Sequence, residues 1–204
     1  MNWPAVLYNK IVYRPVIRLR LKVVGRRFRL GYASEVINPH LFSFGDNVFT
    51  GPHCYFVTNE YSPVKIGSHV MFGPYCKIVG GNHDYRYTGG PLALNKRPLP
   101  EIQEIVVEDG AWIGADTMIL TGASIGEGAV IGAMGLVNHW VPPYTVAVGV
   151  PAKRFFRRFT DDETLEEALR NAGSLYTVDL IREMHRQCGV EMRSIDPLQP
   201  EIES

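Results

Sequence analysis

Among the six histidines of the chain, His83 has the setting that best suits catalysis. Histidine can take up and return a proton near neutral pH, because its unperturbed pKa lies close to the working pH of most enzymes. His83 follows Gly80 and Gly81, which leave access from solvent and let the backbone approach reacting atoms. We therefore predict that His83 is a general base for an attacking hydroxyl or amine, the alternative being a histidine in a surface turn.

A period of six residues organises the chain from Val107 to Val141. Six is not a helical spacing, and it favours a prism of short strands and corners. Three periods, or about 18 residues, would close one triangular coil. Branched residues that would point inward recur at Val107, Ile113, Ile119, Ile125, Ile131 and Val137, and smaller ones follow at Ala111, Thr117, Ala123, Ala129, Gly135 and Val141.

The same period is weaker between Leu30 and Ile78, where Glu60 is the one residue out of pattern. The 29 positions from Ile78 to Val107 are not a multiple of six, and they contain several glycines and prolines. A long loop in a compact domain is usually functional. We therefore predict a protruding loop over residues 82–104, with His83 at its start.

The repeat, the Trp112-Ile113-Gly114 phrase and the Gly149–Lys153 phrase resemble those of the hexapeptide-repeat acyltransferases. The resemblance implies an all-β fold, a left-handed parallel β-helix over residues 30–155. It also implies a homotrimer with active sites between subunits, and acetyl-CoA as co-substrate. The general base of that family is a histidine at the start of a similar loop, which His83 matches.

The later coils are the predicted place for the donor. Ala115 and Ala133 are eighteen residues apart, so they should occupy equivalent places on successive coils and leave room for a pantetheine arm. Asn138-His139 stands where many sugar acetyltransferases have Thr-Lys, and a neutral histidine is a weaker phosphate ligand than lysine. The predicted donor-binding residues are Trp112, Gly114, Ala115, Ala133, Asn138, His139, Lys153 and Arg154.

The resemblance implies a sugar hydroxyl as acceptor, as part of a surface polysaccharide or its precursor. The alternatives are an amino-sugar N-acetyltransferase, a serine or xenobiotic acetyltransferase, and a non-catalytic β-helical scaffold. The carboxylate that orients His83 is left open among Asp84, Glu101 and Glu104. The predicted acceptor-binding residues are His53, Asn82, Asp84, Tyr85 and Arg86.

A zinc hydratase is a further alternative, but His53, His69 and His83 are spaced by sixteen and fourteen residues, unlike the ligands of that group. The three cysteines are too few and too scattered for a disulfide framework, and Cys54 and Cys76 fall on inward positions. We expect no metal and no nucleic-acid partner.

Residues 1–29 form a basic amphipathic segment, because residues 1–30 hold eight basic and no acidic side chains while the net charge of the chain is zero. Pro4 could open a helix there and Pro15 would interrupt one. No signal peptide or spanning segment is predicted, so we expect a cytoplasmic protein. Residues 1–29 would contact the inner face of the membrane or pack on one end of the prism with their arginines in water.

Residues 156–204 are predicted to be a helical extension. Thr160 should begin a capping box, with Glu163 three residues later, and Gly173 should end that helix. A second helix is predicted from near Thr177 to Cys188. Both have an apolar stripe, which favours docking on the open end of the prism or on another subunit.

Overall fold

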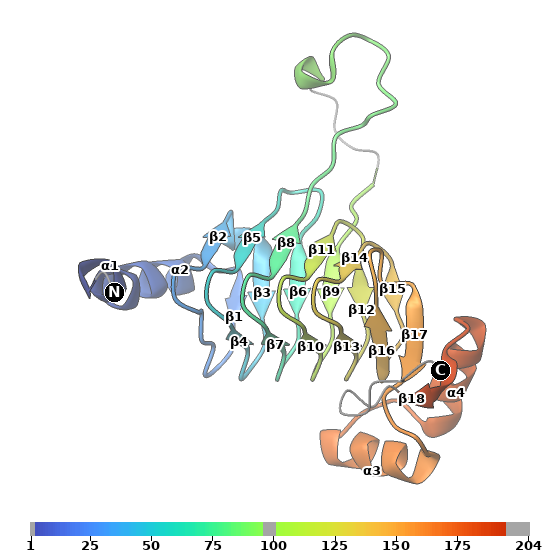
Figure 1. The fold of residues 1–204 in the computed structure, drawn as a ribbon. Helices are drawn as coiled ribbons and strands as arrows, with labels where there is room; N and C mark the ends of the chain where they lie inside the picture. The colour runs from blue at the N-terminus through green and yellow to red at the C-terminus, as the bar shows by residue number, and fades with distance from the viewer. Residues whose placement is uncertain (1–2, 96–100, 195–204) are drawn as a thin grey trace, which may run out of the picture.

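The computed structural model describes residues 3–95 and 101–194, and it is dominated by a parallel β-helix between two helical ends (Figure 1). Each coil gives one short strand to each of three sheets, which we name A, B and C. Sheet A contains β1 (Val23–Val24), β3 (Phe42–Phe44), β6 (Val64–Ile66), β9 (Ile105–Val107), β12 (Ser124–Ile125) and β15 (Trp140–Val141).

Sheets B and C complete the triangle. Sheet B contains β4 (Phe49–Thr50), β7 (Met71–Phe72), β10 (Trp112–Ile113), β13 (Val130–Ile131), β16 (Thr145–Val148), β17 (Arg154–Arg157) and β18 (Glu191–Ser194). Sheet C contains β2 (Glu35–Ile37), β5 (Tyr55–Val57), β8 (Lys77–Val79), β11 (Met118–Leu120) and β14 (Leu136–Val137).

The later coils follow the period of six. Val107 pairs with Ile125 and Ile113 with Ile131, each eighteen residues further along the chain. The branched side chains point into the prism, where Ile113, Ile119 and Ile125 are fully buried. The predicted left-handed parallel β-helix is therefore confirmed. Cys54 and Cys76 are buried in the same core, as predicted.

The early coils are longer than eighteen residues, which corrects the simple repeat. Val36 pairs with Phe56 and Phe44 with Ile66, 20 and 22 residues apart. The extra two residues lie around the 3-10 turn η2 (Pro39–Leu41), and the extra four lie between β5 and β6. The two insertions add up to six residues, one full repeat, so the inward residues after them return to the same six-residue register and the sequence looks regular up to Ile78.

The prism starts before the predicted residue 30, and at its other end it continues past the last six-residue repeat but stays within the predicted residues 30–155. At the N-terminal end β1 pairs with β3, so the β-helix begins at Val23 and not at residue 30. At the other end Val141 is the inward residue of a new strand, and β16 continues sheet B after Pro142 and Pro143. Strand β17 then turns back antiparallel to β16, and β18 pairs with β17, so the C-terminal extension is not purely helical.

The N-terminal helix is continuous through Pro15, contrary to prediction. It runs through α1 (Trp3–Tyr8), a π-helical turn η1 (Asn9–Tyr13) and α2 (Arg14–Arg20). The N–H of Arg14 donates to the carbonyl of Asn9, five residues back. This wider turn accommodates the proline ring and its missing donor without ending the helix.

The two C-terminal helices lie at the other end of the prism (Figure 1). They are α3 (Asp162–Ala172), which ends at Gly173 in the left-handed conformation, and α4 (Val178–Gln187). The N-cap of α3 is Asp161 and not Thr160, because the Asp161 carboxylate accepts from the N–H of Thr164 at 2.7 Å. Among the described residues, no helix has the length and apolar character needed to cross a bilayer.

Candidate functional site

The predicted site residues lie on two different corners of the prism. We name the C–A corner after the connections that lead from sheet C to sheet A, and the B–C corner after those from B to C. His83 and the pair Asn138-His139 lie in connections of the C–A corner, after β8 and β14. Gly114, Ala115, Ala133 and His53 lie in connections of the B–C corner, so sheet C separates the two groups within one chain.

The backbone before His83 is held by the neighbouring coils. The N–H of Gly80 donates to the carbonyl of Val57 at 2.8 Å, and the N–H of Gly81 donates to the Thr121 hydroxyl at 2.9 Å. Gly81 has a φ of +88°, and a Cβ there would lie 2.3 Å from the Asn59 side chain. Only glycine fits this position, which fixes the point at which the loop leaves the prism.

The side chain of His83 is exposed, and no hydrogen bond joins it to any of the described residues. The three carboxylates that could orient it have other surroundings in this chain. Asp84 accepts from the N–H of Arg86 at 3.2 Å and also lies 3.6 Å from its guanidinium. Glu104 pairs with Lys65 at 2.8 Å, and Glu101 is exposed.

The connection from β8 to β9 projects far from the prism (Figure 1). It contains the 3-10 turn η3 (Leu92–Leu94), and residues 96–100 lie outside the described part. The returning chain is tied to the β5–β6 connection, because Gln103 donates to the carbonyl of Tyr61 at 2.8 Å. The predicted acceptor residues Asn82, Tyr85 and Arg86 are all exposed at the base of this arm.

The B–C corner offers small residues and free donors. A Cβ on Gly114 would lie 2.6 Å from the backbone nitrogen of Ala133, so the coils stack closely there. Among the described residues, the N–H groups of Ala115 and Ala133 have no hydrogen-bond partner. The equivalent residues of the two earlier coils are Pro52 and Pro74, which carry no N–H. Ala115 and Ala133 therefore offer free donors to a ligand with amide carbonyls, whereas Pro52 and Pro74 cannot.

The aromatic residue predicted for the donor channel lies on the outer face of sheet B. Trp112 is 51% exposed and pairs with Met71 and Val130 on the neighbouring strands. It precedes Ala115 along the same edge of the prism. This position is compatible with a wall of the groove and equally with a contact between subunits.

Four predicted donor-binding residues follow β14, namely Asn138, His139, Lys153 and Arg154. His139 has Nδ1 3.0 Å from the Asn138 side-chain oxygen and Nε2 3.1 Å from the Ala152 carbonyl, which precedes Lys153. Burial lowers the pKa of His139, and the charge of Lys153 lowers it further, so the ring stays neutral. Lys153 is exposed, whereas Arg154 lies over the ring of Phe156 and 3.9 Å from Glu191. Lys153 is thus the most available cation for a phosphate.

His53 belongs to an aromatic group on the B–C corner, away from His83. Its ring stacks on Tyr75 with centroids 5.1 Å apart, and the edge of Tyr32 lies 5.8 Å away. Within one chain, His53 therefore has the surroundings of a stacked surface ring. It can meet His83 only through a second subunit.

Two contributors to the His83 corner were missed by sequence reasoning, namely Thr121 and Asn59. Thr121 stands one coil after Gly80, at the same corner. The long loop places these two residues 41 positions apart in the sequence, so the repeat did not align them. Placing Val79 beside Leu120 would have revealed the match.

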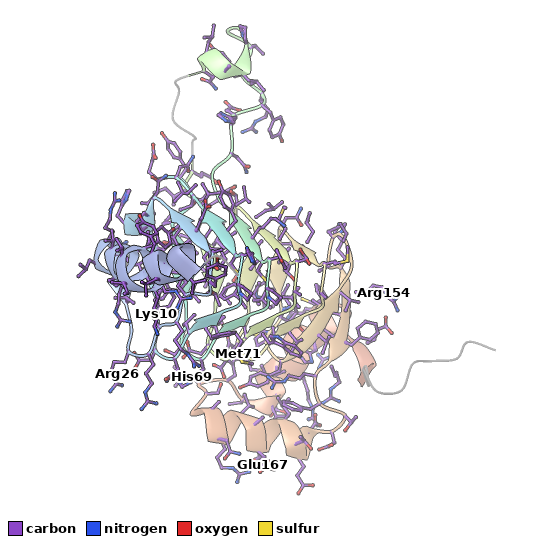
Figure 2. All side chains as sticks on the ribbon, turned by 60° about the vertical axis from the view of Figure 1, so that its left-hand side comes forward. Lys10, Arg26, His69, Met71, Arg154 and Glu167 are labelled. Carbon is purple, nitrogen blue, oxygen red and sulfur yellow. The ribbon has the colours of Figure 1, made fainter. Side chains whose placement is uncertain are left out.

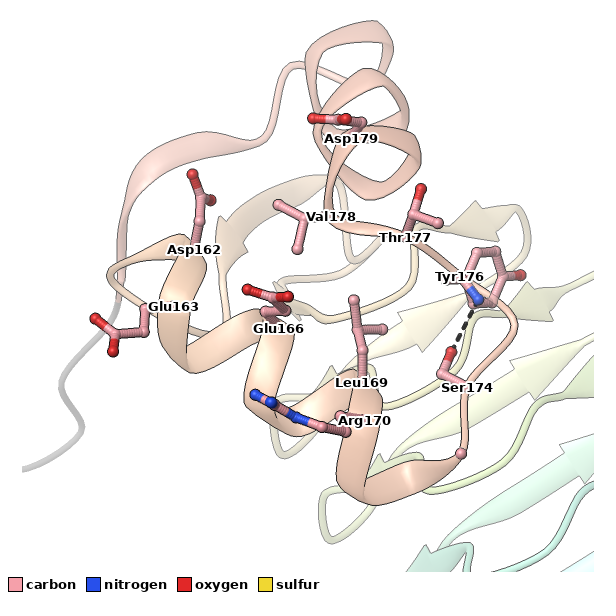
Figure 3. A pocket seen from close by; sticks show the side chains of 11 residues that line it. Asp162, Glu163, Glu166, Leu169, Arg170, Ser174, Tyr176, Thr177, Val178 and Asp179 are labelled. Carbon is pink, nitrogen blue, oxygen red and sulfur yellow. Dashed lines mark hydrogen bonds between the residues drawn. The ribbon is translucent and has the colours of Figure 1, made fainter.

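A separate cavity of about 830 Å³ lies between α3 and α4 (Figure 3). Its walls include Asp162, Glu163, Glu166 and Asp179, and it contains none of the predicted site residues. Within residues 3–95 and 101–194, no three His, Cys, Asp or Glu side chains are grouped as metal ligands.

The chain is similar to several known proteins. Residues 104–139 match the family described as bacterial transferase hexapeptide (six repeats). The chain is 47% identical over 111 residues to a chloramphenicol acetyltransferase from Klebsiella aerogenes, covering 48% of this chain and 50% of that one. It is 32% identical over 139 residues to the galactoside O-acetyltransferase of Escherichia coli K12, covering 65% and 64%.

A solved structure is similar as well. A hexapeptide-repeat acetyltransferase from Vibrio cholerae, complexed with acetyl coenzyme A, superposes with a TM-score of 0.61 and 26% identity, covering 74% of this chain and 80% of that one. The chain spans about half the length of the curated relatives that it matches.

Proposed function

From the match of residues 104–139 to the hexapeptide transferase family and from the parallel β-helix, we propose that this chain transfers an acetyl group from acetyl-CoA to a hydroxyl of a sugar. The observation that carries the proposal is the position of His83, exposed at the start of the protruding loop on a fixed backbone. The sugar would be a unit of a surface polysaccharide or its precursor. The galactoside O-acetyltransferase relative supports this acceptor class.

His83 acts as the general base in this reaction. It takes the proton from the acceptor hydroxyl as the oxygen attacks the thioester carbonyl and forms a tetrahedral oxyanion. When the intermediate collapses, the carbon–sulfur bond breaks and the sulfur of CoA receives that proton from the imidazolium. The products are an acetyl ester and free CoA, and His83 returns to its neutral form.

The donor lies along the B–C corner. The N–H groups of Ala115 and Ala133 donate to amide carbonyls of the pantetheine arm, and the exposed ammonium of Lys153, which lies near His139 of the C–A corner, attracts the phosphates. Small side chains at these positions admit the arm close to the backbone. His139 serves as a neutral hydrogen-bonding neighbour of the phosphate site, not as its cation.

The site is completed by a neighbouring subunit of a homotrimer. His83 and the donor groove lie on different corners of one chain, and a threefold assembly brings the C–A corner of one protomer against the B–C corner of the next. The projecting arm would then reach across, with Leu94 and Tyr85 at 68% and 80% exposure available for burial.

The test is acetyl transfer from acetyl-CoA to a set of acceptors, measured by release of free thiol and by the mass of the product. A galactoside, an amino sugar and serine form the set. The His83→Ala variant should bind acetyl-CoA normally but transfer at least about a hundredfold more slowly. A His40→Ala variant is the matched control, because His40 is exposed on η2. Unchanged transfer by His83→Ala would refute the assignment of the base.

A second candidate acceptor is chloramphenicol. It is favoured by the 47% identity to the Klebsiella aerogenes enzyme, which is higher than the identity to the galactoside O-acetyltransferase. Adding chloramphenicol to the acceptor set decides between the two. If chloramphenicol is turned over faster than any sugar, the acceptor is a xenobiotic and not a sugar. The proposed role of His83 is the same in both cases.

A further inference from the structure

The outer face of the N-terminal helix is apolar and uncovered. Leu19 is 86% exposed and Ile11 is 61% exposed, on a segment that the rest of the chain leaves open to solvent. Single exposed apolar residues are ordinary, but a row along one helix face marks an interaction surface. The row, which we call the outer stripe, consists of Leu7, Tyr8, Ile11, Val12, Val16 and Leu19.

The opposite face of the same helix is anchored to the prism. Ile17 is 5% exposed in the main core, and the Tyr13 hydroxyl accepts from the N–H of Val36 at 3.0 Å. These contacts fix the rotation of the helix about its axis. Because the inner face of the helix packs against the prism through Ile17 and Tyr13, the outer stripe faces away from the prism.

Basic side chains border the outer stripe and line a cavity beside it. The cavity has a volume of about 630 Å³ and contains Lys10, Arg14, Arg18 and Arg29, with aromatic walls from Phe28 and Phe49. Lys10 is visible near the helix in Figure 2. Among the described residues, none of these four cations forms an ion pair with a carboxylate.

We propose that this end of the molecule docks on an anionic phospholipid bilayer. The outer stripe enters the boundary between headgroups and acyl chains, and the basic cavity holds a lipid phosphate. A helix with an apolar face and flanking basic residues lies in the membrane surface for these reasons. The surplus of eight cations without an acid in residues 1–30 complements a negative surface. It repels the same end of a second copy.

Co-sedimentation with phosphatidylcholine vesicles, with and without phosphatidylglycerol, tests the proposal. The full chain should bind the anionic vesicles about tenfold or more tightly than the neutral ones, and salt should weaken the binding. The Ile11→Ser, Leu19→Ser double variant and the Lys10→Gln, Arg18→Gln double variant should each lose about tenfold. Circular dichroism checks that both variants remain folded.

Matched controls carry the same changes at the other end of the molecule. Leu175→Ser removes a side chain that is 98% exposed, and Arg170→Gln, Arg186→Gln removes two exposed cations. Both should bind vesicles like the wild type. Equal binding by wild type and stripe variants would overturn the proposal. Binding of inorganic phosphate without vesicle binding would also overturn the proposal and would indicate a soluble anion as the ligand. A lower oligomer mass in the stripe variants would overturn it as well and would indicate a second copy of the chain as the partner.

Discussion

The hydroxyl of Thr121 contacts the backbone that leads to His83. It accepts from the N–H of Gly81 at 2.9 Å and lies 3.2 Å from the Ser62 hydroxyl, so three connections of the C–A corner meet at this residue. Thr121 touches the loop base and not the reacting atoms. In the proposed reaction, Thr121 would position His83.

Replacing Thr121 by valine should slow acetyl transfer about tenfold, because the loop base loses a bond worth about 1 kcal/mol. The bound acceptor should then meet a less well placed base, so kcat falls while KM for acetyl-CoA stays unchanged. Thr145→Val is the matched control, since the Thr145 hydroxyl donates to the Pro142 carbonyl at 2.7 Å on the remaining corner. Equal loss of kcat in both variants would assign Thr121 a merely structural role.

Residue-level prediction was accurate where one position decides the environment. Cys54 and Cys76 had to be buried because they face inward, and they are. The prediction of Thr160 as the N-cap was wrong, because the carboxylate of Asp161, one residue later, accepts the hydrogen bond from the N–H of Thr164. The surroundings of Asp84 and Glu104 depended on Arg86 and Lys65, whose positions only the folded chain defines.

Helix α4 is held against the prism by a buried histidine. His185 is 6% exposed, and its Nε2 lies 2.8 Å from the carbonyl of Pro143. Burial lowers the pKa of His185, and the nearby charge of Arg157 lowers it further. A neutral ring with Nε2 protonated satisfies the carbonyl without placing a charge in the interior.

The sign of the resulting pH dependence follows from linkage. The pKa of His185 is lower in the folded chain than its unfolded value of about 6.5, so the unfolded chain binds the proton first. Stability is fully present above pH 6.5 or so and is lost as the pH falls toward the folded pKa. Thermal unfolding between acid and neutral pH should show this loss, and His185→Gln should reduce it. His139 has the same sign, so part of the dependence should remain. An unchanged slope in His185→Gln would contradict this account.

At the level of elements, the six-residue repeat predicted the strands of the later coils. It misaligned the early coils, where two insertions together add one full repeat. Phe42, Val48 and Cys54 keep the period of six in the sequence, yet the residues that pair with Ile66, Phe72 and Ile78 of the next coil are Phe44, Thr50 and Phe56. Residues two apart face the same way in a strand, so both sets are buried and burial could not reveal the shift. The π-helical turn before Pro15 was equally hidden, because a proline in a sequence usually predicts a break.

At the scale of the whole molecule, prediction placed the right residues on the prism but not their division between corners. The sequence position of His83 and that of Ala115 both lie near the loop. Only the closed triangle shows that sheet C separates them. This division makes a single chain insufficient for the proposed reaction.

Mixing two inactive variants tests that consequence. His83→Ala lacks the base, and Ala133→Trp should block the donor groove, so each alone should transfer little. Each proposed site needs an intact His83 from one protomer and an intact groove from the next. In trimers formed at random from equal amounts, both are present at about a quarter of the sites, so about a quarter of the wild-type rate should return. No recovery, with mixed trimers demonstrated by mass, would mean that one chain contains the whole site.

Pro52, Pro74, Ala115 and Ala133 stand at equivalent places on four successive coils of the B–C corner. Ala115 and Ala133 stand on successive coils, so their free donors are spaced by one coil of about 4.8 Å, and Lys153 comes after the last coil. Adding one eighteen-residue coil between Ala115 and Ala133 would move the cation by that step and supply one more donor. In the proposed reaction, the number of coils would therefore set the length of ligand that fits between His83 and Lys153.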